Sequence, residues 1–498
     1  MPVSRESLPV DYPDERVSSG VVGLDDVLGG GFPQGHSFLV QGEPGTGKTT
    51  LGLQFLMDGA RRGEQVLYVT LSESQREIEK VARSHGWTLE NLTIFEYTPT
   101  EDSLRPEDQY SAFHPSEVEF QDTTQNILAE VDRVQPARVV LDSLSEIRLL
   151  ARDSLLYRRQ VLALKHFFTN RNCTVLLLDG RTGTVQDLQL QSIAHGVLML
   201  EKVPREYGRT RRRLQVSKLR GSKYREGYHD YSIETGGIRV YPRLVANEHR
   251  AGAVSGTVSS GLAELDSLWG GAIDRGTSTL LLGPAGSGKS SVSMSYAVAA
   301  VERGETAAMF LFEEWTRLAC TRAASLGMDV TSWLEKKKLF MEQIDPAELS
   351  PGEFVQRVRE TLEEHKPTVI VIDSLNGFIN AMPGEHHLVI MMHELLMFLN
   401  QRGAATFVVL SQAGLMGDAI TSPVDLSYLA DNVLLFRYFE AHGRFRKALS
   451  VVKKRSGGHE DTIRELSMAG GRIHIGPALK EFRGVLTGVP TYLGSGGT

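Results

Sequence analysis

The sequence has little cysteine, no excess of basic residues and no long apolar run. Only Cys173 and Cys320 occur in 498 residues, in spacings that do not match a metal site, so no disulfide scaffold is expected and a reducing compartment fits. The formal net charge of −7 gives no general attraction to nucleic acid or to an anionic membrane. No 18-residue apolar run exists and the N-terminus lacks the apolar core of a signal peptide, so we expect a cytoplasmic protein without a membrane partner.

What the sequence does contain is one nucleotide-binding pattern, twice. Residues 42–49 read GEPGTGKT and residues 283–290 read GPAGSGKS, and both fit G-x-x-x-x-G-K-[ST]. Glycines let backbone N–H groups surround phosphate oxygens at the start of the following helix, the lysine reaches the β- and γ-phosphates, and the final hydroxyl holds Mg²⁺. A short apolar run precedes each loop, and helical patterns follow at 51–62 and 292–303. We therefore expect two sites for ATP and Mg²⁺.

The chain is a tandem repeat of one domain. A shift of 241 residues aligns Gly42 with Gly283 and Glu73 with Glu314, without a gap from Ser19 to Gly86. We expect a flexible N-terminal tail over 1–17, a first ATPase domain over 18–246, a linker over 247–259, a second domain over 260–492 and a C-terminal tail over 493–498.

Short β-branched runs alternate with amphipathic helical patterns in each half. The runs of the first half are 66–70, 138–141, 174–178 and 197–200, and those of the second are 308–312, 369–372, 406–410 and 433–436. This alternation predicts an α/β fold, with a mostly parallel sheet and helices on both faces. The stretches 214–218 and 447–452 predict added antiparallel strands.

Candidate metal ligands and catalytic acids follow the apolar runs. Asp142 and Asp373 end equivalent runs, and with Thr49 and Ser290 they are our candidates for holding Mg²⁺; a helix cap is the alternative for such an aspartate.

The acids expected to polarise the attacking group are Glu73, Glu313 and Glu314. Glu313 and Glu314 are adjacent, whereas Ser72 precedes Glu73, so only the second half keeps a double carboxylate. Solvated glutamates at a helix start are the alternative.

Basic residues recur near the end of each half. The runs 218–220 (KLR) and 453–455 (KKR) occupy equivalent places, and in ring ATPases such residues reach the γ-phosphate held by a neighbouring subunit. A basic edge that protects a strand is the alternative. The run 209–213 (RTRRR) lacks interleaved aromatic residues, so we interpret it as a solvated turn and expect no nucleic-acid partner.

Together these residues resemble the KaiC family, the tandem RecA-like ATPases and autokinases of bacterial circadian clocks. The likeness runs from Ser18 to about Tyr492. It rests on both loops, on 82–87 (ARSHGW), on the adjacent Glu313 and Glu314, on 219–221 (LRG) and on 459–465 (HEDTIRE). The resemblance implies two tandem RecA-like P-loop NTPase domains, in a divergent homologue that assembles as a homohexamer with ATP at the subunit interfaces.

The resemblance also implies the ATP-binding residues of each half. In the first half they are Gly45, Thr46, Gly47, Lys48, Thr49, Thr50, Ser84, Lys218, Leu219, Arg220, Ser222 and Tyr224. In the second half they are Gly286, Ser287, Gly288, Lys289, Ser290, Ser291, Lys447, Lys453, Lys454, Arg455 and Ser456.

Two departures from the family shape the expected function. KaiC-like proteins phosphorylate an adjacent Ser-Thr pair, but the matching residues here are Ser427 and Tyr428, which leaves Ser427 as the candidate acceptor; a serine lining the subunit interface is the alternative. The sequence stops at Thr498 without the tail that binds KaiA, so a KaiA-type partner is not expected, while a KaiB-like partner on the first domain stays compatible.

We therefore expect a hexameric ATPase and serine/threonine autokinase in clock-like or stress signalling. The alternatives are a RecA-type DNA-dependent motor and an ATP-dependent oligomeric scaffold with little catalysis. Neither a daily rhythm, an output partner nor the turnover rate of each domain follows from the sequence.

Overall fold

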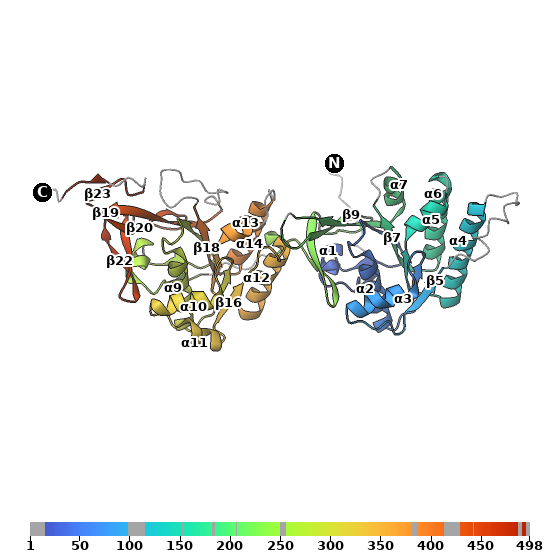
Figure 1. Ribbon diagram of the computed structural model, residues 1–498, viewed down its shortest axis with the longest axis horizontal. Helices are drawn as coiled ribbons and strands as arrows, with labels where there is room; N and C mark the ends of the chain where they lie inside the picture. The colour runs from blue at the N-terminus through green and yellow to red at the C-terminus, as the bar shows by residue number, and fades with distance from the viewer. Residues whose placement is uncertain are drawn as a thin grey trace, which may run out of the picture. The chain divides into compact units, whose positions relative to one another are not determined.

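A computed structural model describes residues 15–97, 115–151, 154–181, 185–205, 207–249, 255–380, 387–412, 429–441, 443–486 and 491–494. The chain divides into two compact units, Met1–Arg243 and Leu244–Thr498 (Figure 1). Residues 246–249, part of which we expected to lie in a linker, form a short 3-10 helix, and the Ala246 N–H donates to Glu394 of the second unit at 2.8 Å. None of the helices in the described part of the chain has the length and apolar character needed to cross a membrane.

The first unit alternates strands and helices along most of its length. Its helices are α1 (Leu24–Leu28), α2 (Lys48–Arg61), α3 (Gln75–Ser84), α4 (Pro115–Val134), α5 (Leu144–Leu150), α6 (Ser154–Asn170) and α7 (Val185–Ile193). Its strands are β1 (Arg16–Val17), β2 (Phe32–Pro33), β3 (Ser37–Gly42), β4 (Val66–Thr70), β5 (Thr93–Glu96), β6 (Arg138–Asp142), β7 (Thr174–Gly180), β8 (Gly196–Val203), β9 (Arg211–Leu219), β10 (Tyr228–Glu234) and β11 (Gly237–Tyr241).

The second unit repeats this order. Its helices are the 3-10 helix η3 (Ala246–His249), α8 (Ala263–Leu268), α9 (Lys289–Glu302), α10 (Thr316–Ser325), α11 (Val330–Glu335), α12 (Pro351–His365), α13 (Leu375–Asn380) and α14 (Leu388–Gln401). Its strands are β12 (Thr257–Val258), β13 (Ile273–Asp274), β14 (Ser278–Gly283), β15 (Ala307–Leu311), β16 (Leu339–Gln343), β17 (Val369–Asp373), β18 (Ala405–Ser411), β19 (Asn432–Ala441), β20 (Arg444–Lys454), β21 (Arg464–Ala469), β22 (Arg472–Ala478), β23 (Phe482–Arg483) and β24 (Thr491–Tyr492).

Each unit contains one nine-stranded sheet within its described residues. The orders are β11-β10-β9-β8-β3-β7-β6-β4-β5 and β16-β15-β17-β18-β14-β19-β20-β21-β22. Strands β5, β4, β6, β7, β3 and β8 pair in parallel, and β9 to β11 extend the sheet antiparallel. The predicted α/β class is therefore confirmed, with a mostly parallel sheet in each half.

Both faces of each sheet carry helices, as Figure 1 shows. Buried side chains alternate along the central strands: Phe38 and Val40 pack with α2 on one face, and Leu39 packs with α6 on the other. The second sheet divides in the same way between α9 and α14. Because both faces are covered, the central strands are apolar throughout, which is why the sequence located them well.

The interpretation of residues 209–213 as a solvated turn is wrong. Residues 211–213 begin β9, where the Arg211 guanidinium is buried against Asp230, with Nε 2.8 Å from Oδ1. Arg213 donates to Glu201 at 2.7 Å. Three of the four arginines in the run are thus paired with acidic side chains of the neighbouring strands, Arg209 through Glu234 at 3.4 Å, which sequence periodicity did not reveal.

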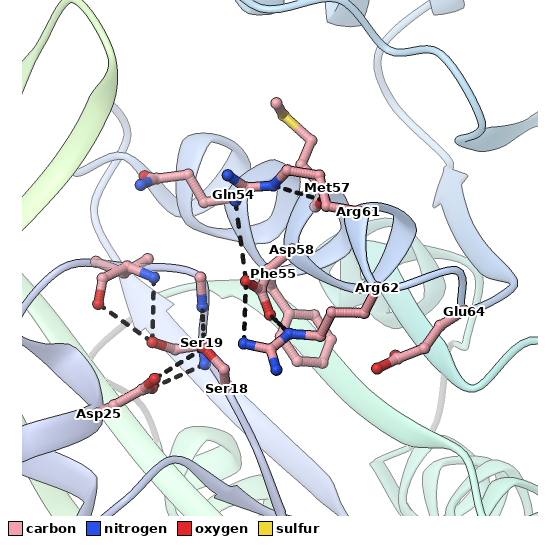
Figure 2. A network of polar contacts seen from close by, with 12 residues as sticks. Ser18, Ser19, Asp25, Gln54, Phe55, Met57, Asp58, Arg61, Arg62 and Glu64 are labelled. Carbon is pink, nitrogen blue, oxygen red and sulfur yellow. Dashed lines mark hydrogen bonds and ion pairs between the residues drawn. The ribbon is translucent and has the colours of Figure 1, made fainter.

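A buried arginine fastens the first unit together. Arg138, 1% exposed at the start of β6, donates to Glu64 at 2.6 and 2.9 Å and to Asp58 at 3.2 Å. It also donates to the Ser18 carbonyl at 2.9 Å. Figure 2 shows Asp58 on α2, paired with Arg62, above the turn where Ser18 and Ser19 reach Asp25.

The second unit has Val369 in the equivalent position of its own strand, fully buried. The charged network around Arg138 is therefore particular to the first unit. It links the segment before α1, the helix that follows the first nucleotide loop, and a central strand.

We predict that Arg138→Met destabilises the first unit by about 3–5 kcal/mol, because it leaves the partly buried Glu64 carboxylate without its arginine and removes one of the cations that contact Asp58. Hydrogen exchange of the full chain would show this as faster exchange in α2 and β6 with α9 and β17 unchanged. The control is Arg133→Met, which removes an exposed ion pair with Glu130. Equal exchange in the Arg138 and Arg133 variants would contradict a fastening role.

Candidate functional site

The first phosphate loop joins β3 to α2. Gly47 precedes the helix with φ 93°, a left-handed conformation that favours glycine, and a Cβ there would lie 2.6 Å from the Ile233 side chain. The Lys48 ammonium donates to the carbonyls of Gly42 at 2.8 Å and Glu43 at 3.2 Å. Lys48 therefore braces the backbone of the loop in which we expect the phosphates to bind.

The second loop has the same geometry between β14 and α9. Lys289 donates to the carbonyls of Gly283 at 2.8 Å and Pro284 at 2.7 Å. Burial lowers the pKa of Lys289 to about 8, although Asp373 and Glu313 oppose the shift. Burial also lowers the pKa of Lys48, opposed by Asp142 and Asp179. Each ammonium is thus partly desolvated, and a bound anion would stabilise its charged form.

The first metal candidates lie together at the start of α2 and the end of β6. The Thr49 hydroxyl donates to Asp142 Oδ2 at 2.9 Å, and the buried Tyr68 hydroxyl donates to the same oxygen at 2.6 Å. A hydroxyl and a carboxylate beside a phosphate loop fit Mg²⁺, which in nucleotide sites takes its other ligands from phosphates and water. When bound, the ion would neutralise phosphate charge.

The second metal site lacks the phenol. Asp373 ends β17, and burial raises the pKa of its carboxyl, while a hydrogen bond with Ser290 and the charge of Arg322 oppose that shift. Met309 occupies the register of Tyr68, 241 residues later. Ser290 and Asp373 still supply the donor set that Mg²⁺ prefers.

Glu73 stands apart from the other acids. Burial, and then the charge of Asp142, raise the pKa of Glu73. Among the described residues, its buried Oε2 finds no hydrogen-bond partner. A carboxylate held in this way is a better proton acceptor than an exposed one, and it is open to a bound molecule.

Glu313 and Glu314 point to different partners. The Ser374 hydroxyl donates to Glu313 Oε1 at 2.6 Å, and the Glu313 charge is felt by Lys289. Glu314 instead receives two hydrogen bonds from Arg322, at 2.6 and 3.2 Å. The double carboxylate expected from the sequence is therefore divided, with one acid facing the loop lysine and the other held by arginine.

The basic residues near each domain's end lie far from the loop of their own unit. Lys218 on β9 is in register with Val197 of β8, which is opposite Leu39, three residues before the loop begins at Gly42. That offset is roughly 10 Å along the strand. Lys453 is likewise in register with Val433, opposite Leu280, three residues before Gly283.

These side chains contact backbone carbonyls or aspartates of their own unit. Lys218 donates to the carbonyls of Gln191 and Ala194 at 2.7 and 2.8 Å, and Arg220 to that of Ser192 at 2.8 Å. The equivalent residues of the second unit have these partners: Lys453 with the Ala430 carbonyl, Lys454 with that of Trp269, Arg455 with Asp431 and Ser456 with Asp274.

Other predicted ATP-binding residues are distributed between these two ends. Ser84 closes α3 beside His85, whose ring lies 3.5 Å from the Thr50 hydroxyl, so both lie near the first loop. Lys447 pairs with Tyr438, whose hydroxyl donates to the Ala285 carbonyl at 3.2 Å, and therefore lies near the second loop.

At the opposite end of the first sheet, Leu219 is buried, Ser222 accepts from Arg16 at 3.0 Å and Tyr224 packs on the core. The remaining loop residues, Gly45, Thr46, Gly286, Ser287, Gly288 and Ser291, belong to the two phosphate loops and the helix starts that follow them. Ser427 and Tyr428 lie outside the described residues.

Sequence reasoning missed three side chains at these sites. Tyr68 lies inside an apolar run, and Arg322 lies eight residues after the acid that it binds. Asp179, at the end of β7, is fully buried and contacts Arg148, and its charge acts on Lys48. A comparison of the two halves could have found them, because each stands where the other half has an apolar residue. The pairs are Tyr68 with Met309, Arg322 with Val81, and Asp179 with Leu410.

Comparisons with known proteins agree with the repeat. The sequence model of the KaiC ATPase family matches residues 17–245 and again residues 258–480. The chain is 26% identical over 490 residues to the circadian clock protein KaiC3 of Synechocystis sp. (strain ATCC 27184 / PCC 6803 / Kazusa), covering 96% of this chain and 95% of the relative.

It is also 26% identical to proteins named circadian clock oscillator protein KaiC. Over 486 residues it resembles that of Acaryochloris marina (strain MBIC 11017), covering 96% and 91% of the two chains. Over 491 residues it resembles that of Synechococcus elongatus (strain ATCC 33912 / PCC 7942 / FACHB-805), covering 96% and 92%.

We predict that Tyr68→Phe weakens Mg²⁺-dependent nucleotide binding at the first loop several-fold, because Asp142 loses a buried donor worth about 1 kcal/mol. Calorimetric titration of a non-hydrolysable ATP analogue at graded Mg²⁺ would measure it. Met309→Leu, at the matched position, should leave the second site unchanged. An unaltered Mg²⁺ dependence in Tyr68→Phe would show that the phenol does not hold the carboxylate.

We also predict that nucleotide binding at the second loop takes up a proton above pH 8. Phosphate favours the ammonium form of Lys289, and the free side chain loses its proton as pH rises through about 8. Affinity should then fall by up to about tenfold per pH unit. Calorimetry in buffers of different ionisation enthalpy would count the protons. Lys289→Arg, which stays charged, should abolish the uptake; uptake that persists in this variant would assign it elsewhere.

Proposed function

The chain belongs to the KaiC family of ATPases, and from that premise we propose that both units bind and hydrolyse Mg²⁺·ATP and that the second also phosphorylates a serine of its own chain. The observation that carries the proposal is the recurrence, in both units, of a lysine-braced loop beside a hydroxyl–aspartate pair and an acid.

Within each site the residues divide the work of phosphoryl transfer. Lys48 and Lys289 exchange their loop carbonyls for phosphate oxygens, and the Thr49–Asp142 and Ser290–Asp373 pairs hold the metal. Glu73 in the first site and Glu313 in the second orient the attacking group and accept its proton. Positioning and charge stabilisation are the main contributions that a protein makes to this reaction.

Each site is completed by a neighbouring subunit. Lys218 and Arg220, and likewise Lys453 and Arg455, lie at the opposite end of their sheet from their own loop, so a second copy is needed to bring them to a γ-phosphate. A ring with six copies of the chain, with ATP at the interfaces, is the assembly proposed. Lys218 and Lys453 must then give up the backbone carbonyls that they contact within their own unit.

The second unit has the features expected of a kinase site. Glu313 is exposed, lies two residues after the end of β15, and has no arginine partner among the described residues. It can therefore accept the proton of a serine hydroxyl, for which Ser427 is the candidate, with Tyr428 in place of a second acceptor. Clock-type or environmental stress signalling, through a KaiB-like partner on the first unit, is the proposed use.

A DNA motor is the weaker alternative. Three of the four arginines at residues 209–213 are paired with Glu234, Asp230 and Glu201, which leaves Arg212 rather than a continuous basic stripe. A scaffold that uses ATP only to hold subunits together would not need a Glu73 carboxylate whose buried Oε2 has no hydrogen-bond partner among the described residues and whose pKa is raised by Asp142 after burial.

We predict complementation between two inactive variants in a background with the second site silenced by Glu313→Gln and Glu314→Gln. Lys48→Ala lacks the loop cation, and Arg220→Ala lacks the arginine proposed to reach the neighbouring subunit's γ-phosphate, so neither should hydrolyse ATP alone. Mixed rings restore about a quarter of the interfaces when subunits mix at random. ATPase assays before and after subunit exchange measure this. Mixtures that stay inactive although mass measurements show mixed rings would rule out shared sites.

We predict that γ-labelled ATP labels the chain at Ser427 and that Glu313→Gln removes the label while ATP stays bound. Mass spectrometry locates the phosphate, and Ser427→Ala is the matched control. Glu73→Gln should lower ATP hydrolysis without reducing the label. Hexamers that hydrolyse ATP yet carry no phosphate would sink the kinase and leave the ATPase.

A further inference from the structure

One arginine joins the acidic pair of the second site to the helix that follows the phosphate loop. Arg322, on α10, donates from Nη2 and Nε to the two oxygens of Glu314, at 2.6 and 3.2 Å. Its Nη1 donates to the hydroxyl of Ser291, on α9, at 3.2 Å. The side chains of Arg322 and Glu314 are 24% and 22% exposed. The contact is therefore a partly buried, bidentate ion pair at the edge of the site.

The first unit lacks this connection. Val81 stands at the register of Arg322, and Thr50 at that of Ser291, each 241 residues earlier. Thr50 contacts His85 instead, at 3.5 Å. Glu73, at the register of Glu314, keeps a buried oxygen that accepts no hydrogen bond from any described residue. Residues equivalent in sequence thus have different partners in the two sites.

The ion pair changes what Glu314 can do. A carboxylate that accepts a guanidinium hydrogen bond on each oxygen is held in one orientation and has fewer lone pairs left for an attacking group. Glu313 has no such partner among the described residues, is exposed, and is close enough to act on Lys289. Register equates Glu73 with Glu314, but Glu73 and Glu313 share the lack of an arginine partner among the described residues.

Charge balance gives the arginine a second task. Glu314 and Arg322 both act on Asp373, in opposite directions, so the three groups lie within electrostatic reach. Without Arg322, the uncompensated Glu314 would lie beside Asp373 and close to the triphosphate. Its repulsion would oppose the charge that phosphoryl transfer develops.

We propose that Arg322 is a positioning residue of the second site: it holds Glu314 as a structural counter-ion and leaves Glu313 as the carboxylate that takes the proton of the attacking group. The proposal rests on the proposed function of this site. Through Ser291, Arg322 also ties α10 to the helix that begins in the phosphate loop, so that both acids keep their place relative to the nucleotide.

A double-mutant cycle in the full chain tests this, with Glu73→Gln throughout to silence the first site. Arg322→Met should lower kcat about tenfold and change KM less, because a freed Glu314 disturbs transfer more than binding. Glu314→Gln alone should have a small effect. The double variant should return to within about twofold of Glu314→Gln, because no charge is left uncompensated.

Two further variants separate positioning from packing. Arg322→Lys keeps the cation and should recover part of the lost kcat, although it loses the bidentate geometry. Arg317→Met, at an exposed position of the same helix, should match the parent. A double variant whose loss equals the product of the two single losses would overturn the proposal. So would a Glu314→Gln variant that loses turnover while Glu313→Gln keeps it.

Failure of the proposed function would look different. A parent that binds nucleotide but transfers no phosphate would refute catalysis at the second loop. The same cycle, measured as the thermal shift with Mg²⁺ and a non-hydrolysable ATP analogue, would then still test the contact. Coupling between Arg322→Met and Glu314→Gln in that shift supports positioning, and additivity refutes it.

Discussion

The parallel direction of the central strands is the constraint on which both sites depend. Parallel strands end at one edge of the sheet, so the phosphate loop after β3 meets the aspartate that ends β6 and the acid that follows β4. The same direction sends the antiparallel β9 back to the opposite edge. The strand direction thus brings the loop, the candidate metal ligands and the candidate acid together, and it separates them from Lys218 and Arg220.

Duplication gave two such edges, and their surroundings then diverged. In the first site, Tyr68 donates to Asp142, the candidate metal ligand, and the charge of Asp179 acts on the loop lysine. In the second site, Met309 stands at the register of Tyr68, and the added polar contacts are those of Arg322 with Ser291 and Glu314. The first unit also depends on a buried arginine where the second has valine. The halves therefore share a scaffold but not an electrostatic design.

Much of the fold followed from the sequence because strands covered on both faces are apolar throughout, as 66–70 and 369–372 are. The loops were equally visible, since few other eight-residue patterns combine their glycines, lysine and hydroxyl. Side-chain partners were not visible. Register equated Glu73 with Glu314, but a carboxylate's role depends on a neighbour one helix away, and Arg322 is one of 54 basic residues. Residues 211–213 were misjudged for the same reason, because their acidic partners lie on other strands.

The contact between the lysine and its loop has a consequence for the kinetics of nucleotide binding. Lys48 and Lys289 already hold the carbonyls at the start of their loops, so the loop backbone is folded around a cation before any anion arrives. Nucleotide entry is then a substitution of oxygen ligands around an ammonium group, not the folding of a segment. Encounter should be governed by diffusion and local field, and residence time by how readily the lysine returns to its carbonyls. The dissociation step becomes the natural point at which a partner could set the pace.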